Sequence, residues 1–226
     1  MMTLTEAIQA RHSVRRYRPT PLSAEAKAAL EAKIREVNAE GGLHVQLICD
    51  EPRAFTGVFA YGKFCGVTSY LVMVGRKAPD LDERIGYYGE QLVLLAQQLG
   101  LNTCWAGLSY RKVADTYTLG DGEKICCYIA LGYGETQGTP RKSKSAKEIS
   151  NVSDTTPQWF RDAIEAVLLA PTAINQQKFY FEYVGEGTKV IARRLFSLVG
   201  YTQMDMGIAK LHFEIGAGRK IDWTDK

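Results

Sequence analysis

A polar stretch at residues 135–156, containing Gly, Pro, Lys and Ser, divides the 226-residue chain into two unequal parts. A run of turn-forming residues without apolar periodicity is typical of a linker that crosses between two regions of a protein. After the linker the order helix, loop, strand, helix begins again, as a shortened copy of the first part. Because this order is not a strict βαβ alternation, the sequence predicts an α+β fold with two unequal halves, residues 1–150 and 151–226.

Local patterns predict the helices and strands of both parts. Capping residues and apolar side chains three or four positions apart predict a helix from Thr3 to Ala10, one from Ser23 to Gly41-Gly42, one from Ile85 to Leu99, and a last one through Met204, Ile208, Leu211 and Ile215. Thr156 and Pro157 have the chemistry of an N-cap and a first helical residue, so a further helix is expected to begin there. The runs LHVQLIC, SYLVMVG, ICCYIALGYG and KFYFEYV predict strands.

Composition excludes several classes of protein. The formal net charge of +3 is too small to indicate a general nucleic-acid binder, and 46% hydrophobic residues predict a packed globular fold. No apolar run approaches the roughly 20 residues that span a bilayer, and the N-terminus lacks the apolar region of a signal peptide. We therefore expect a cytoplasmic protein without a membrane partner. The five cysteines and three histidines lack metal-ligand spacings, so neither a disulfide framework nor a metal site is predicted.

Positive charge is concentrated in ARHSVRRYRP, residues 10–19. Arg11, Ser13 and Arg15 alternate, so an extended backbone would place their side chains on one face. Two guanidinium groups and a hydroxyl form a good receptor for a phosphate monoester. A second basic cluster, TPRKSK with Arg141 and Lys142, could converge on the same phosphate. The alternative is a solvated basic segment, and residue spacing alone does not decide between the two.

The run APTAINQQ, residues 170–177, has a different chemistry. Asn175 and Gln177 carry amides that both donate and accept hydrogen bonds, which suits a flat heterocycle with alternating N–H and C=O groups. Pro171 and Thr172 would place backbone and a hydroxyl nearby. An ordinary helix-to-strand loop rich in turn formers would have the same composition. In the run LNTCWAG, Gly107 allows a close approach of the backbone to a ligand.

In combination, these fragments resemble the FMN-dependent nitroreductase family. RHSVRRY is similar to its R-x-S-x-R stretch, and APTAINQQKF is similar to its P-S-x-x-N-x-Q-P-W loop. GLNTCWAGL, IALGYG and PRKSK resemble its later helix, strand and phosphate-contacting tail. Three loop positions depart from the pattern: Thr172 replaces serine, Lys178 proline and Phe179 tryptophan. The resemblance implies a nitroreductase-like fold, with a central, mostly antiparallel sheet flanked by helices.

The order of the fragments differs from the order in that family. Its members are normally homodimers in which both subunits hold each flavin, and the N-x-Q loop follows soon after the arginine stretch. Here the loop follows the tail, in the second part of the chain. The resemblance therefore implies a single-chain, monomeric pseudo-dimer, in which residues 1–150 hold the FMN phosphate and residues 151–226 supply the loop. One complete flavin site per chain is expected.

The resemblance also implies roles for individual residues. Arg11, Ser13, Arg141 and Lys142 would hold the FMN phosphate, with His12 beside it. Arg15 would reach the pyrimidine edge of the ring, where a fixed cation stabilises the reduced flavin. The other predicted cofactor-binding residues lie at the ring: Ala106 and Gly107 through backbone amides near N5, Asn175 and Gln177 at the ring or ribityl edge, and Pro171 and Thr172 beside them.

These roles imply an FMN-dependent oxidoreductase that takes electrons from NADH or NADPH and passes them, in a ping-pong sequence, to a small electrophilic acceptor such as a nitro compound or a quinone. No catalytic side chain is expected, because the flavin N5 accepts the hydride. The first alternative is a flavin-binding protein without turnover, since a degenerate duplication could lose its substrate pocket. The second is an anion- or nucleic-acid-binding module that uses the arginines alone, with strongly salt-dependent binding.

Overall fold

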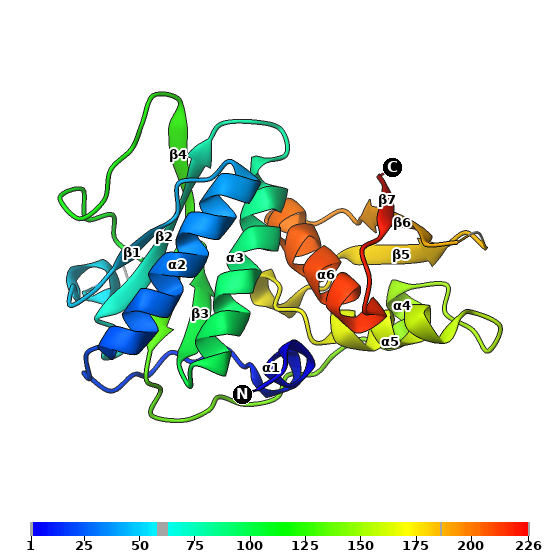
Figure 1. Ribbon diagram of the computed structural model, residues 1–226, viewed down its shortest axis with the longest axis horizontal. Coiled ribbons are helices and arrows are strands. Elements are labelled where there is room, and N and C mark those ends of the chain that lie inside the picture. The colour runs from blue at the N-terminus through cyan, green and yellow to red at the C-terminus, as the bar shows by residue number, and fades with distance from the viewer. Residues whose placement is uncertain (1, 58–62, 186, 226) are drawn as a thin grey trace.

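The computed structural model describes residues 2–57, 63–185 and 187–225, which form two sheets and the helices around them (Figure 1). The helices are α1 (Leu4–Ala10), α2 (Ala24–Gly41), α3 (Leu81–Gln98), α4 (Ala146–Ile149), α5 (Gln158–Leu168) and α6 (Thr202–Ala217). The strands are β1 (Gln46–Ile48), β2 (Ser69–Arg76), β3 (Asn102–Ala106), β4 (Glu123–Gly132), β5 (Phe179–Tyr183), β6 (Lys189–Arg194) and β7 (Asp222–Asp225). Within these ranges no helix is both long and apolar enough to cross a membrane. The predicted α+β class is confirmed.

The helices begin and end where local chemistry requires it. Thr3 and Glu6 form the predicted capping box at the start of α1, with the Glu6 amide donating to Thr3 Oγ1 at 3.2 Å. Ser23 Oγ accepts from the Ala26 amide at 3.1 Å and caps α2, which ends before Gly42 in the left-handed conformation. These boundaries follow the sequence because each cap uses residues within one turn of the helix.

The start of α5 differs from the prediction by one residue. Pro157, rather than Thr156, occupies the N-cap position, and the helix begins at Gln158. The Thr156 hydroxyl instead donates to the carbonyl oxygen of Ser153 at 2.7 Å, closing a turn before the helix. A threonine hydroxyl can bond to a backbone group of the helix that follows it or of the turn that precedes it, and here it bonds to the turn.

The first sheet is antiparallel, with strand order β1-β2-β4-β3. Side chains of β2 alternate between its faces: Leu71 and Met73 join one buried cluster with α2 and α3, and Tyr70 and Val72 join another with Tyr17. In Figure 1, α2 and α3 lie across the face turned to the viewer. Because both faces are covered, the strand needs apolar side chains at every position, which explains the continuous run SYLVMVG.

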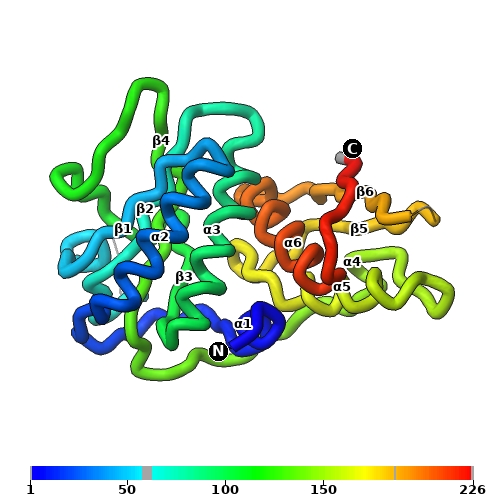
Figure 2. Tube along the Cα trace, in the orientation of Figure 1, coloured from blue at the N-terminus to red at the C-terminus, as the bar shows by residue number. Residues whose placement is uncertain are grey.

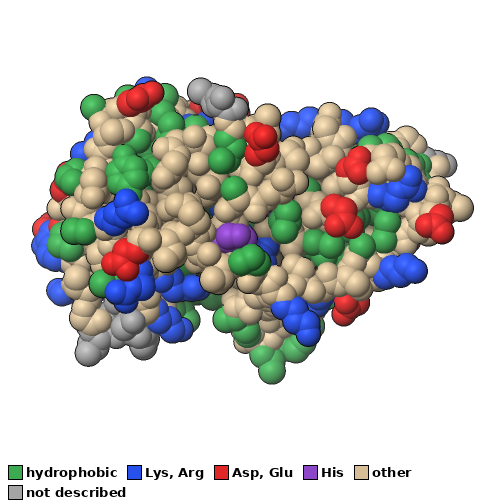
Figure 3. Space-filling model, turned by 90° about the horizontal axis from the view of Figure 1, so that it is seen from below, with side chains coloured by type: hydrophobic (Ala, Val, Ile, Leu, Met, Phe, Trp, Pro, Cys, Tyr) green, Lys and Arg blue, Asp and Glu red, His purple; other side chains and the backbone are tan. Residues whose placement is uncertain are grey.

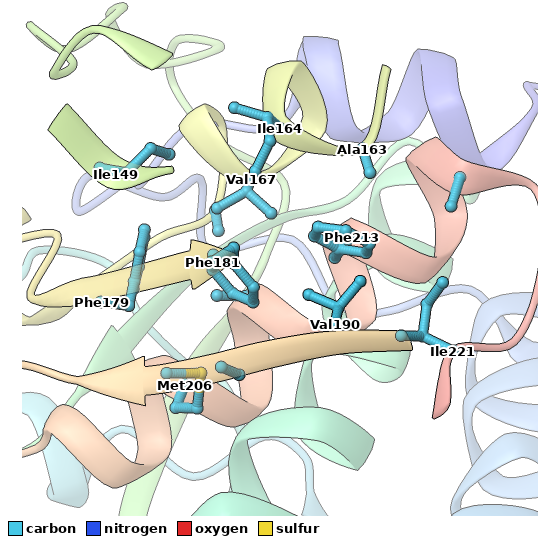
Figure 4. Close-up of a cluster of buried hydrophobic side chains, with 14 of the residues drawn as sticks. Ile149, Ala163, Ile164, Val167, Phe179, Phe181, Val190, Met206, Phe213 and Ile221 are labelled. Carbon is cyan, nitrogen blue, oxygen red and sulfur yellow. The ribbon is translucent and has the colours of Figure 1, made fainter. Parts of the chain in front are cut away.

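The second sheet has strand order β5-β6-β7, with an antiparallel β5–β6 pair and a parallel β6–β7 pair. Its apolar face packs against α5 and α6. Figure 4 shows Phe181 and Val190 pointing toward Phe213, with Ile164 and Val167 of α5 on the other side of the cluster. The predicted strand KFYFEYV is therefore confirmed as the strand that anchors this core.

The stretch predicted as a linker contributes to the second core. Residues 146–149 form α4, and Ile149 is fully buried in the cluster around Phe181. Ser150 also forms a parallel bridge with Phe181. The predicted boundary after residue 150 falls between the strands of the two sheets in the sequence. The end of the linker, however, packs against the second sheet.

Helices α3 and α6 join the two sheets. They run side by side at the centre of the molecule, one from each part of the chain (Figure 2). Glycines make the close approach possible: a Cβ on Gly207 would lie 1.9 Å from the Glu83 carbonyl oxygen, and one on Gly86 would lie 2.0 Å from that of Met204. Backbone therefore contacts backbone at this crossing, which fixes the spacing of the two parts.

Candidate functional site

A cavity of about 310 Å³ opens between the two parts of the chain. The first part contributes the arginine stretch and the end of β3, and the second contributes the loop after α5 and the start of α6. Lining residues include Ser13, Arg15, Trp105, Ala106, Gly107, Pro171, Thr172, Ile174, Val199, Tyr201 and Asp205. The site is thus built from segments that lie far apart in the sequence.

The arginine stretch reaches the cavity in an extended conformation. The Val14 amide donates to the Thr103 carbonyl at 3.0 Å, so the chain lies along β3. Val14 faces the core, and Ser13 and Arg15 on either side of it line the cavity. The predicted extended backbone is confirmed. Arg11 is not on this wall, however, because it is the C-cap of α1 and its side chain turns into the interior.

Arg11 and Arg141 form a buried cationic cluster. Arg11 is only 2% exposed, and its Nε lies 3.7 Å from Glu90 Oε1, beyond hydrogen-bond distance. Among the described residues, Arg11 Nε and Nη2 and Arg141 Nε are buried without a hydrogen-bond partner. Arg141 Nη2 donates to the Ala170 carbonyl at 2.8 Å. Since each buried, unsatisfied donor costs about 1–3 kcal/mol, the cluster is suited to an anionic acceptor.

Burial and neighbouring positive charge disfavour the charged forms of these groups. Burial lowers the pKa of Arg11, although the charge of Glu90 opposes this. Burial and then the charge of Arg11 lower the pKa of Arg141 to about 10. His12, half-buried beside them, has its pKa lowered by burial and then by both arginines. An anion among these groups would favour their charged forms.

Glu90 connects the cationic cluster to the cavity wall and to the second part of the chain. This fully buried carboxylate accepts from Trp105 Nε1 at 2.9 Å, and its other oxygen lies 3.0 Å from His212 Nε2. The other ring nitrogen of His212 lies 3.1 Å from the Ala166 carbonyl oxygen. One carboxylate on α3 therefore links β3 and α6, and holds the Trp105 ring at the cavity.

The loop after α5 has an unusual backbone. Ile174, Asn175 and Gln177 have φ values of 46°, 59° and 43°, in the left-handed region. For Ile174 and Gln177 this conformation costs roughly 1–2 kcal/mol each, whereas asparagine adopts it more readily. The surroundings hold it in place: the Ala173 amide donates to Asp205 Oδ1 at 2.9 Å, and the Gln177 amide donates to Thr172 Oγ1 at 3.2 Å. Strained backbone held in this way is common at ligand sites.

This loop is hydrogen-bonded to the basic tail that carries Arg141. Asn175 Nδ2 donates to the Lys142 carbonyl at 2.7 Å, while Asn175 Oδ1 is buried without a partner among the described residues. Gln177 is 1% exposed; its Oε1 accepts from the Lys144 amide at 2.9 Å, and its Nε2 donates to the Leu168 carbonyl at 3.3 Å. The tail thus brings the loop to the same side of the molecule as Arg11.

The structure brings most of the predicted residues to two neighbouring places. Ser13, Arg15, Ala106, Gly107, Pro171 and Thr172 line the cavity, and His12 lies beside the cationic cluster of Arg11 and Arg141. Lys142 contributes its carbonyl to Asn175 and has an exposed side chain. Both ends of the Gln177 amide are engaged, Oε1 with the Lys144 amide of the tail and Nε2 with the Leu168 carbonyl of α5, and its contact with the cofactor stays a prediction.

Several site residues were not predicted from the sequence. Tyr201 of the second part packs on Gly107, where a Cβ would lie 2.7 Å from its ring. Asp205, 3% exposed, lines the cavity, and burial raises its pKa to about 6. Glu90 is the third. One signal was available for it: an acid one turn after Gly86, among the mainly apolar and small residues that α3 buries.

Comparisons with known proteins agree with this architecture. A model of the family described as “Putative TM nitroreductase” matches residues 3–217. A “putative nitroreductase” from Thermotoga maritima has a solved structure with a TM-score of 0.70 and 22% identity, covering 97% of this chain and 87% of that one. No curated protein matches the chain.

Two further solved structures share the fold over part of the chain. A “Putative NADH dehydrogenase/NAD(P)H nitroreductase” from Parabacteroides distasonis has a TM-score of 0.51 and 20% identity, covering 65% of this chain and 95% of that one. A “putative nitroreductase in complex with FMN” from Desulfovibrio desulfuricans has a TM-score of 0.51 and 18% identity, covering 68% and 98%. The predicted nitroreductase-like fold, with antiparallel sheet and flanking helices, is confirmed.

Proposed function

This chain belongs to the “Putative TM nitroreductase” family, and from that premise we propose that it is an FMN-dependent oxidoreductase. Its electrons would come from NADH or NADPH and pass to a small electrophilic acceptor such as a nitro compound or a quinone. FMN, when bound, would supply this two-electron chemistry. The residues of the chain would bind and orient the cofactor and shape the space above it. The cytoplasmic location expected from the sequence stays a prediction.

The buried cationic cluster is the observation that carries the proposal. Three buried nitrogens of Arg11 and Arg141 have no partner among the described residues. The phosphate of FMN is a compact dianion with several acceptor oxygens, which suits two guanidinium groups. Ser13, which lines the neighbouring cavity, would add its hydroxyl, and His12 lies beside both arginines.

The cavity next to this cluster has features that suit the ring of FMN. Arg15 lines it with an exposed guanidinium, and would hold a positive charge at the pyrimidine edge. Gly107 at the end of β3 lets the backbone come close, and Trp105 supplies a flat apolar wall. Asn175 Oδ1, buried without a partner in the described part of the chain, could accept from an N–H of the ring or a hydroxyl of the ribityl chain.

We further propose that the chain is a monomeric pseudo-dimer with one flavin site. The cavity is lined by both parts of the same chain, as Arg15 and Asp205 illustrate. The Desulfovibrio structure aligns over 98% of its own length but 68% of this chain, which leaves about a third of this chain for an additional role. A shortened second half that takes the place of a partner subunit would fill that role.

The absorbance spectrum of the purified protein, with released flavin counted per chain, tests the proposal. We expect a flavin spectrum and one FMN per chain, since the described residues contain one such cluster of unpartnered arginine nitrogens. NADH or NADPH should then bleach the flavin absorbance in a stopped-flow experiment. Bound FMN that stays oxidised with both donors would favour a flavin-binding protein without turnover. A protein that does not bind flavin would contradict both the oxidoreductase and the flavin-binding protein.

Replacement of Arg15 by alanine should lower the midpoint potential of bound FMN more than it weakens FMN binding. The guanidinium would stabilise negative charge that collects on the pyrimidine edge during reduction. Because Arg15 is exposed, solvent screens it, and we expect a decrease of about 30 mV, equivalent to about 1.4 kcal/mol for a two-electron couple. Redox titration against a reference dye measures the potential.

Arg16→Ala is the matched control, because that side chain pairs with Glu135 outside the cavity. Equal potentials in the two variants would contradict the role of Arg15.

A further inference from the structure

Exposed apolar side chains border the cavity on two sides. Residues 195–200, between β6 and α6, include Phe196 and Leu198, which are 81% and 93% exposed. Ile174, on the loop after α5, is 79% exposed and lines the cavity together with Val199. On the face shown in Figure 3, hydrophobic side chains gather on a projection at the lower edge. Apolar groups left in water around a cavity are typical of a binding surface.

The side chain of Gln176 ties these two segments together. Its Nε2 donates to the Gly200 carbonyl at 2.9 Å and to Asp205 Oδ2 at 2.8 Å, and its Oε1 accepts from the Ser197 hydroxyl. Both N–H groups and the carbonyl are therefore engaged. Only one orientation of the amide satisfies all three partners.

Asp205 anchors this arrangement from the first turn of α6. Its side chain is 3% exposed, and while Oδ2 accepts from Gln176, Oδ1 accepts from the Ala173 amide at 2.9 Å. The loop it holds contains Ile174 and Asn175 at positive φ, a conformation that relaxes unless the surroundings fix it. Asp205 thus contacts the loop directly and the apolar segment through Gln176.

We propose that Asp205 is a positioning residue that holds residues 172–177 and residues 195–200 together as two joined walls of the cavity mouth, where they select apolar acceptors. The selection of acceptors rests on the proposed function, whereas the anchoring does not. The position requires a carboxylate. An asparagine at position 205 would place its NH2 group against the NH2 group of Gln176, and two donors cannot form a hydrogen bond. Rotating the Gln176 amide would turn its oxygen toward residue 205, but the hydrogen bond to the Gly200 carbonyl would then be lost.

Hydrogen–deuterium exchange on the purified protein tests the anchoring. Asp205→Asn should accelerate exchange of backbone amides in both walls by about tenfold or more, as expected for a lost charge-assisted hydrogen bond. Ser197→Ala should accelerate exchange in residues 195–201 only, because Ala173 and Gln176 stay bound to Asp205. The control is Glu182→Gln, an acid-to-amide change at the ion pair with Arg193 on the second sheet, which should alter neither wall.

Steady-state kinetics test the selection of acceptors. Menadione, an apolar two-ring quinone, should show a KM at least about fivefold higher in Asp205→Asn, while the KM for ferricyanide, a small polar acceptor, stays within about twofold. The melting temperature should stay within about 4 °C of the wild type, because removal of a carboxylate whose burial is unfavourable offsets the lost bonds.

Each part of the proposal can fail separately. Unchanged exchange in both walls would overturn the anchoring, whatever the kinetics. If Asp205→Asn accelerates exchange but changes the KM of both acceptors equally, the two walls do not select apolar acceptors, and that part of the proposal is overturned. If the wild-type protein binds no FMN or reduces neither acceptor, the proposed function fails, and the exchange experiment still decides whether Asp205 holds the two walls.

Discussion

Replacement of Arg11 by alanine is expected to weaken FMN binding by about two orders of magnitude. Arg11 Nε and Nη2 are buried without partners among the described residues, so both are available to a phosphate dianion. A hydrogen bond between charged groups contributes about 1.5–3 kcal/mol, and about 2.7 kcal/mol corresponds to a hundredfold change in Kd. The Kd can be measured by the fluorescence quenching of FMN added to protein from which flavin has been removed.

Two further variants separate loss of the phosphate contact from loss of folding. Arg16→Ala removes an equally charged neighbour that is 67% exposed and paired with Glu135, and should leave the Kd within about twofold. Arg11→Ala also leaves Glu90 buried without its nearby guanidinium, so the melting temperature should decrease. Adding Glu90→Gln should restore much of the stability but not the affinity. A Kd within about threefold of wild type in Arg11→Ala would mean that the phosphate binds elsewhere.

Elements with local signals were predicted well from the sequence. The capping box of Thr3 and Glu6 lies within one turn of α1, and the apolar run of β2 reflects burial on both faces of the first sheet. Strands β3, β6 and β7 were not predicted, and the run GLNTCWAGL, which resembles the family's later helix, contains β3 instead. β7 has four residues and its parallel pairing with β6 is long-range, so tertiary contacts rather than its own composition stabilise it.

The candidate site was predicted in part, for a similar reason. Arg11 and Arg141 belong to recognisable basic clusters, but the charge that faces buried Arg11 is that of Glu90, which lies on a helix much later in the chain. Asp205 gave no signal, because an acid in the first turn of a helix is already explained by its interaction with the helix dipole. Residues that hold other residues are the hardest to predict, since their partners are known only after folding.

Gly207→Ala should strongly destabilise the protein and weaken FMN binding, although alanine is the better helix former by about 1 kcal/mol. The new Cβ would lie 1.9 Å from the Glu83 carbonyl oxygen and 2.8 Å from the Tyr87 nitrogen, both in the backbone of α3. Backbone cannot rotate away, so the two helices must separate. We expect the free energy of unfolding to fall by at least about 2 kcal/mol, measured by urea denaturation.

The effect on FMN follows from the position of Gly207 in α6. Asp205 and Ile208, on either side of it, line the cavity, and Trp105 lines it from the first part. A wider gap between α3 and α6 would therefore shift these lining residues relative to one another. Gly89→Ala is the control, because its Cβ would meet the Trp105 ring at 2.6 Å and the Met73 methyl at 2.8 Å, side-chain atoms that can shift. That variant should lose less stability than Gly207→Ala. A melting temperature for Gly207→Ala at or above that of the wild type would show that the two halves are not held together by this backbone contact, because only the helix preference of alanine would then remain.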